Sequence, residues 1–178
     1  MGFLVLERKG AKDVRLFIAV PLSARMRAAV MAVQEEFRRG GVRGNYAKAE
    51  NLHLTLAFIG EYPDPDFVLD ALDTVPFEPF ELRLRGLGAF RDLWWIGLEE
   101  NPALAACARR VRRALAGAGI PFDRKRFSPH ITLIRRAEGI GQTMPGVAVP
   151  EAAMTVDHIA LMRSDRGRDG MIYTELER

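Results

Sequence analysis

The chain has 178 residues, of which 48% are hydrophobic and 28% charged, and its formal net charge at pH 7 is +3. This length suits one well-packed domain, and no apolar run approaches the roughly 20 residues of a membrane-spanning helix. The single cysteine, Cys107, excludes an intramolecular disulfide, and the mild basic excess permits a nucleic-acid partner without requiring one.

Residues 1–13 precede the repeated pattern of the chain and are predicted to be an N-terminal extension. Their apolar stretch, residues 2–6, is too short for the core of a signal peptide and is followed at once by charged residues. We therefore expect a cytoplasmic protein with no membrane partner, in which residues 14–178 form a single two-lobed domain.

The first half of this domain alternates between strand and helix patterns. A segment with apolar residues at helical spacing lies between two apolar runs of strand length and ends at Gly40 and Gly41. The elements predicted here are, in chain order, a strand at residues 14–20, a helix at 22–39, a strand carrying His53, a short helix at 66–72 and a strand starting at Phe80.

The second half repeats this order. Its predicted elements are a strand at residues 93–98, a helix at 102–116, a strand carrying His130, and two strands at 155–162 and 171–176 around a turn at 165–170. The doubled pattern indicates an internal duplication with a pseudo-two-fold axis. We therefore predict an α+β fold of two pseudo-symmetric lobes, each an antiparallel sheet backed by helices, with the active-site groove between them.

Each half contains one copy of a short motif, His53-Leu54-Thr55-Leu56 in the first and His130-Ile131-Thr132-Leu133 in the second. Because side chains alternate between the two faces of a strand, the histidine and the threonine of each copy point the same way. A reaction that removes one proton and supplies another needs two such imidazoles. The pseudo-two-fold axis would bring both copies face to face across the groove.

In this order the two motifs resemble those of the 2H phosphoesterase superfamily, and specifically of its RNA 2′,3′-cyclic phosphodiesterase family, formerly called 2′-5′ RNA ligase. The resemblance extends from Val14 to the C-terminus. It also includes residues 15–19, 50–60, 86–90, 127–133 and 170–173. The chain departs from the family at Tyr46 and Ala49, where a tryptophan and a proline are usual, and both positions belong to the rim of the expected groove.

The resemblance implies a hydrolase that opens RNA 2′,3′-cyclic phosphate ends to 2′-phosphates, and whose reverse reaction would form a 2′-5′ bond. Spacing alone leaves the roles of the two histidines open, and the family implies His53 as the proton donor and His130 as the proton acceptor. Thr55 and Thr132 would donate hydrogen bonds to the phosphoryl oxygens. We expect no metal and no other cofactor, because the histidines lack metal-ligand spacing and the attacked phosphorus lies in a strained ring.

Four further residues are candidates for substrate contacts. The family implies a phosphate-binding role for Arg135, although strict alternation places it on the face opposite His130 unless a bulge turns it into the groove. Phe17, Tyr46 and Phe127 are candidates to stack on a base, as aromatic residues do in single-strand RNA sites, with packing in the core as the alternative for each.

Other conspicuous residues are expected to have structural roles. His158 has no threonine two positions later and is predicted to be a structural or surface residue. Trp94 and Trp95 should divide between core and exterior, and the arginines within residues 109–113 should form a solvated helix face.

Two other functions fit the same residues. One is a phosphodiesterase for small cyclic nucleotides such as ADP-ribose 1″,2″-cyclic phosphate, and the other is a non-catalytic RNA-binding module. The intact histidine and threonine pairs argue against a loss of catalysis, and the basic residues 124–126 favour an RNA end over a free nucleotide. We therefore expect a monomer that acts on RNA ends with a 2′,3′-cyclic phosphate, tRNA-derived ends being one option.

Overall fold

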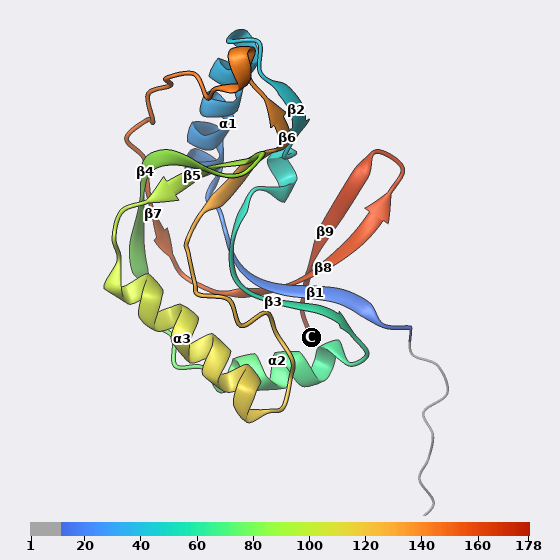
Figure 1. Ribbon diagram of the computed structural model, residues 1–178. Helices are drawn as coiled ribbons and strands as arrows, with labels where there is room; N and C mark the ends of the chain where they lie inside the picture. The colour runs from blue at the N-terminus through green and yellow to red at the C-terminus, as the bar shows by residue number, and fades with distance from the viewer. Residues whose placement is uncertain (1–11) are drawn as a thin grey trace, which may run out of the picture.

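The computed structural model describes residues 12–178, so residues 1–11 of the predicted extension lie outside the described part. Nine strands and three α-helices of the described part form two antiparallel sheets with helices packed against them (Figure 1). The predicted α+β class and the two-sheet architecture are confirmed. No helix within residues 12–178 is long and apolar enough to cross a membrane.

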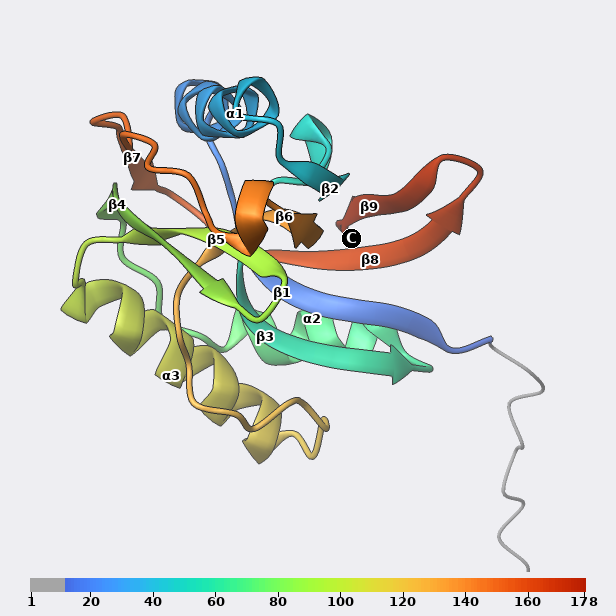
Figure 2. The same cartoon turned by 45° about the horizontal axis from the view of Figure 1, so that its top comes forward.

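The first sheet has the strand order β3-β1-β8-β9. Its strands are β1 (Val14–Pro21), β3 (His53–Tyr62), β8 (Ala160–Gly167) and β9 (Gly170–Leu176). Since β1 lies between β3 and β8, residues 16–20 are all buried, and this explains their continuous apolar run. β8 and β9 form a hairpin that points upward and away from β1 and β3 in Figure 1, and Figure 2 shows the same hairpin from another side.

The second sheet has the strand order β2-β6-β5-β4-β7. Its strands are β2 (Arg43–Tyr46), β4 (Phe80–Phe90), β5 (Leu93–Leu98), β6 (Ile131–Glu138) and β7 (Ala153–Val156). β6, which carries the second motif, pairs with β5 as β3 pairs with β1 in the first sheet. The repeated order of the sequence therefore corresponds to two similar antiparallel strand pairs.

The helices are α1 (Ala24–Arg39), α2 (Pro65–Asp73) and α3 (Pro102–Gly117), and two short 3-10 turns lie at Ala49–Asn51 (η1) and Ile140–Gln142 (η2). Each α-helix begins at a side-chain oxygen that accepts a backbone N–H, those of Ser23, Asp64 and Asn101. These caps explain where the sequence turns from strand to helix.

Two of the helices pack against the sheet that does not contain the strand before them in the chain (Figure 2). α1 follows β1 in the chain but packs against the second sheet, where Phe37 contacts Trp94 with 5.3 Å between ring centroids. α3 follows β5 but packs against β3 and α2. The two lobes are therefore tied together by helices that belong in sequence to the opposite half.

Two details of the predicted organisation are wrong. The single strand predicted at residues 155–162 is in fact β7 in the second sheet and β8 in the first, joined by residues 157–159 that cross between the sheets. The short β2 was not predicted, because Arg-Gly-Asn-Tyr is polar and forms a strand only by pairing with β6. Each sheet thus takes strands from both halves of the sequence.

Candidate active site

The two sheets meet where β3 and β6 contact each other, and a groove of about 1530 Å³ opens there. Both motifs line it. His53 and Thr55 come from β3, Thr132 comes from β6, and His130 is the residue immediately before β6. The structure therefore brings together the two histidines and two threonines that the sequence analysis singled out.

His53 is held at both ring nitrogens. Its Nδ1 lies 2.6 Å from the backbone oxygen of Asn51, and its Nε2 lies 2.9 Å from Oγ1 of Thr55. Because a carbonyl oxygen only accepts hydrogen bonds, Nδ1 carries a proton, and Nε2 is the nitrogen that can exchange one. In the neutral ring, Nε2 accepts a hydrogen bond from the Thr55 hydroxyl.

The Nδ1 atom of His130 has the same kind of partner on the other side of the groove. Its Nδ1 lies 2.7 Å from the backbone oxygen of Ser128, again two residues earlier in the chain. This contact makes Nδ1 the donor and leaves Nε2 as the exchangeable nitrogen of His130. Backbone carbonyls thus select the same tautomer in both histidines without the help of another side chain.

The pKa of His53 is lowered from the ordinary histidine value. Burial is the largest cause, because the charged ring loses hydration in the groove. The Asn51 carbonyl opposes this effect by accepting from the protonated ring, while the positive charges of Arg135 and His130 lower the pKa further. The neutral form of His53 is therefore favoured in the free protein.

A β-bulge at Leu133 turns Arg135 into the groove. Two consecutive residues of β5 lie opposite Ile134 and Thr132 of β6, so Leu133 between them is an extra residue without a partner on β5. The bulge shifts the alternation of β6. Leu133 and Ile134 are both buried, and Arg135 lines the groove together with Thr132. Strict alternation would place Arg135 on the face opposite His130, and the bulge places it in the groove instead.

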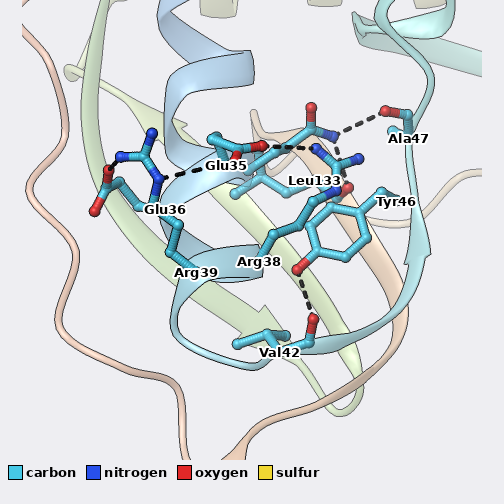
Figure 3. A network of polar contacts seen from close by, with 9 residues as sticks. Glu35, Glu36, Arg38, Arg39, Val42, Tyr46, Ala47 and Leu133 are labelled. Atoms are coloured by element: carbon cyan, nitrogen blue, oxygen red, sulfur yellow. Dashed lines mark hydrogen bonds and ion pairs between the residues drawn. The ribbon is translucent and has the colours of Figure 1, made fainter.

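The backbone of this bulge is well supported. The oxygen of Leu133 accepts hydrogen bonds from the backbone N–H of Ala47 at 2.9 Å and from Nε2 of the buried Gln34 at 3.0 Å. The same Gln34 nitrogen donates to the Ala47 oxygen at 2.9 Å, and Figure 3 shows Ala47 and Leu133 side by side in this network. Gln34 thereby holds the bulge in place next to Thr132.

Comparison with known proteins identifies the family to which this arrangement belongs. The family model described as the 2′-5′ RNA ligase superfamily matches residues 21–168. The chain belongs to this superfamily.

A relative from Thermus thermophilus, named RNA 2′,3′-cyclic phosphodiesterase, is 33% identical over 93% of this chain and 89% of its own length. A Geobacillus stearothermophilus relative of the same name is 31% identical over 86% of this chain, which spans about half (53%) of that relative. The crystal structure of E. coli LigT complexed with 3′-AMP superposes with a TM-score of 0.75 at 27% identity, over 93% of this chain and 96% of LigT.

Aromatic side chains flank both histidines of this superfamily member. The ring centroids of Phe17 and Tyr173 lie 4.8 Å and 5.3 Å from that of His53, and the centroid of Phe90 lies 5.1 Å from that of His130. Phe17 is only 4% exposed, so it packs against His53 and has little surface left for a base. Tyr173 and Phe90 were missed in the sequence analysis, although both lie in segments that carry the family resemblance.

Arg112 links the loop at residues 123–128 to β3 through hydrogen bonds. Its guanidinium donates to the backbone oxygens of Leu56 at 3.2 Å and Lys125 at 2.7 Å, and lies 5.6 Å from the ring centroid of Phe127. The predicted solvated helix face is therefore wrong for Arg112, which is half-buried and lines the groove. Phe127 also lines the groove, where its predicted contact with a base stays a prediction.

Tyr46 lies away from the groove lining. Its hydroxyl donates to the backbone oxygen of Val42 at 2.8 Å, and the Arg38 guanidinium lies 4.2 Å from its ring centroid (Figure 3). The ring thus packs at the edge of the second sheet, between β2 and α1. This position does not support the expected nucleoside contact, because one face of the ring is already covered by Arg38.

His158 also lies outside the groove lining, in the crossing between β7 and β8. Its Nδ1 lies 2.6 Å from a carboxylate oxygen of Asp157 and its Nε2 3.3 Å from one of Glu175. These carboxylates raise the pKa of His158, with the Asp157 hydrogen bond as the largest cause. The contacts account for this histidine as a link between the crossing and β9.

Positive charge predominates along the groove. Its lining includes four acidic residues and eight basic ones, the latter being Lys12, Arg15, Arg112, Lys125, Arg126, Arg135, Arg163 and Arg166. Within residues 12–178, no group of three or more His, Cys, Asp or Glu side chains is placed to hold a metal ion. The groove is suited to an anionic ligand held by hydroxyls and guanidinium groups.

Proposed function

We propose that this chain hydrolyses RNA 2′,3′-cyclic phosphate ends to 2′-phosphates by acid–base catalysis between His53 and His130. The observation that carries the proposal is the matched pair of imidazoles in one basic groove, each with Nδ1 bonded to a backbone carbonyl so that Nε2 is the nitrogen that exchanges a proton. The name RNA 2′,3′-cyclic phosphodiesterase, shared by the relatives, supports the same reaction.

The proposed reaction uses both motifs on one phosphorus atom. His130 accepts a proton from water as the water oxygen forms a bond to phosphorus. His53 donates its Nε2 proton to the ribose 3′ oxygen as the bond from phosphorus to that oxygen breaks. The hydroxyls of Thr55 and Thr132 donate to the non-bridging oxygens, and Arg135 adds positive charge where negative charge develops.

His53 must be protonated to act as the donor, although its pKa is lowered in the free protein. A cyclic phosphate carries one negative charge, and an anion beside the ring favours the imidazolium form. We therefore infer that substrate binding protonates His53, and that Thr55, no longer needed as a donor to Nε2, then turns its hydroxyl toward the phosphate. The acid would form only when there is a phosphate to receive its proton.

Product analysis tests the proposal. An oligoribonucleotide with a 2′,3′-cyclic phosphate end is incubated with the protein in EDTA, and the end groups are resolved before and after phosphatase treatment. Conversion to a phosphomonoester by the unaltered chain, and not by His53→Ala or His130→Ala, is the expected result. Tight binding without conversion would identify a non-catalytic RNA-binding module, and faster conversion of ADP-ribose 1″,2″-cyclic phosphate would favour the small-nucleotide function.

Ligation follows from the same geometry with another nucleophile. An RNA 5′-hydroxyl in place of water would give up its proton to His130 and bond to phosphorus, while His53 protonates the 3′ oxygen as the bond from phosphorus to that oxygen breaks. The bond from phosphorus to the 2′ oxygen stays, so a 2′-5′ linkage results. Ligation, a cytoplasmic location and a monomeric state stay predictions. A ligation assay at high RNA concentration tests the first of these directly.

A further inference from the structure

The groove continues well past the two histidines along the first sheet. Arg15 of β1 lies opposite Ser164 of β8, and Ser164 lies opposite Tyr173 of β9. Residues directly opposite each other share one face of a sheet, and all three line the groove. Two residues further toward the hairpin turn, Arg166 and Met171 form the next pair on this face.

These five residues, Arg15, Ser164, Arg166, Met171 and Tyr173, are here called the hairpin track. Tyr173 and Met171 are half-buried and offer apolar surface, whereas Arg15 and Arg166 are exposed. Among the described residues neither arginine has a carboxylate within ion-pair distance. The Arg15 guanidinium lies 4.9 Å from the ring centroid of Phe58, which holds it over the groove.

The charges at the borders define the direction of the track. Glu61 lies opposite Arg15 on β3, the strand on the side of β1 away from β9, whereas Asp13 precedes β1 at the end nearest the hairpin turn. Asp165 of β8 also lines the groove, and its carboxylate is paired with Arg163 at 2.7 Å. The cationic and apolar surface therefore follows β8 and β9, which form the hairpin that extends from the molecule in Figures 1 and 2. A phosphate backbone is favoured along this side and repelled on the other.

The length of the track exceeds one nucleotide. Phe17, which packs on His53, lies opposite Met162, and Arg166 is four residues further along β8. At about 3.3 Å per residue this separation is roughly 13 Å. A stacked strand rises about 3.4 Å per nucleotide, so the track has room for roughly three to four nucleotides.

We propose that the hairpin track binds the RNA strand that precedes the cyclic-phosphate nucleotide, with Arg15 and Arg166 on backbone phosphates and Tyr173 and Met171 under bases. The combination of a cationic track with aromatic and apolar surface is the one that binds single-stranded nucleic acid without sequence preference. The inference rests on the proposed function, since it takes the cyclic phosphate between the histidines as the end of the strand. It makes the enzyme selective for oligonucleotide ends over mononucleotides.

A length series tests this inference. We expect kcat/KM to rise from a 2′,3′-cyclic mononucleotide to an oligoribonucleotide of about four residues and then to level off. The double variant R15A/R166A should lose roughly tenfold on the tetranucleotide, because each exposed charge contact contributes up to about fivefold, and should be unchanged on the mononucleotide. Arg168→Ala, in the turn of the same hairpin but outside the groove lining, is the matched control.

Salt dependence gives a second measure of the same contacts. Removing two phosphate contacts should make the slope of log kcat/KM against log salt shallower by about 1.4 for the tetranucleotide, at about 0.7 for each single-strand contact. A flat length series, or equal losses on mononucleotide and tetranucleotide in R15A/R166A, would overturn the track. Mononucleotide hydrolysis by the unaltered chain reports on the proposed function separately, so the two failures are distinguishable.

Discussion

Replacing Gly88 by alanine should displace Trp95 and thereby disturb His130, the proposed proton acceptor. Gly88 of β4 lies opposite Trp95 of β5, and the indole ring of Trp95 covers the glycine. A Cβ at position 88 would lie 2.2 Å from Cζ2 and 2.3 Å from Cη2 of Trp95. Carbon atoms in contact are normally about 3.5–4.0 Å apart, so the ring must move by about 1 Å or more.

The displaced ring would disturb His130. The centroid of Trp95 lies 6.2 Å from that of His130 and 5.3 Å from that of Phe90, and Phe90 itself packs edge-on against His130. We expect Gly88→Ala to lower the free energy of unfolding by about 1–3 kcal/mol, as overpacking does. Because a misplacement of about 1 Å in a catalytic group can cost about 10²-fold in rate, kcat/KM should fall by a comparable factor.

Denaturant unfolding and steady-state kinetics on a 2′,3′-cyclic mononucleotide measure the two effects. Gly146→Ala is the control, since a Cβ there meets no atom within 4 Å. Adding Trp95→Val removes the ring that clashes. In that background Gly88→Ala should lower the free energy of unfolding by no more than about 0.5 kcal/mol. An equal cost in both backgrounds, or wild-type activity in Gly88→Ala, would refute the coupling between Gly88 and His130.

The remaining predictions concern the reaction itself. His53→Ala and His130→Ala should each lower kcat/KM by at least about 10²-fold, whereas His158→Ala and addition of EDTA should leave it nearly unchanged; activity that EDTA abolishes and a divalent ion restores would contradict the metal-free scheme. Because burial lowers the pKa of His53, its ring protons should titrate below the ordinary histidine range in NMR, and inorganic phosphate should raise that pKa. If His53 stayed neutral with phosphate bound, the donor and acceptor roles would have to be exchanged. The pH–rate profile should be bell-shaped, with the acid lost as pH rises and the base lost as pH falls, and a single limb would mean that only one imidazole titrates. A nuclease that distinguishes 2′- from 3′-phosphate ends should find the 2′-phosphate, and a 3′-phosphate would show that the family analogy fails at this site.

The arrangement of the His53 and His130 motifs could be predicted from sequence because it is local. The alternation of a strand places His53 and Thr55 on one face whatever the rest of the chain does. Their partners are local too, since each histidine bonds to the backbone oxygen two residues earlier, at Asn51 or Ser128. The position of Arg135, in contrast, depends on the bulge at Leu133, which is stabilised by hydrogen bonds to residues far away in the sequence.

Other parts of the site depend on tertiary structure. Tyr173 reaches His53 only because β9 adds to the edge of the sheet that contains β3 and β1, and no local pattern reveals that pairing. The prediction for residues 155–162 failed for a related reason, since one apolar alternation serves two strands in different sheets. Residue propensity and apolar periodicity predict that a segment is a strand, but the sheet it joins depends on which other parts of the chain its side chains pack against.

The two motifs are nearly identical in sequence, yet the fold gives their histidines different surroundings. His53 is the first residue of β3 and packs against Phe17 and Tyr173, and its Nε2 already has a hydrogen-bond partner in Thr55. His130 precedes its strand, beside the exposed Phe90, and only its Nδ1 is bonded to protein. Two histidines in identical surroundings would favour the same protonation state, but acid–base catalysis needs one ring charged while the other is neutral. Because burial favours the neutral form of His53 in the free protein, its proposed donor role depends on the bound phosphate, whose negative charge favours the imidazolium form of His53.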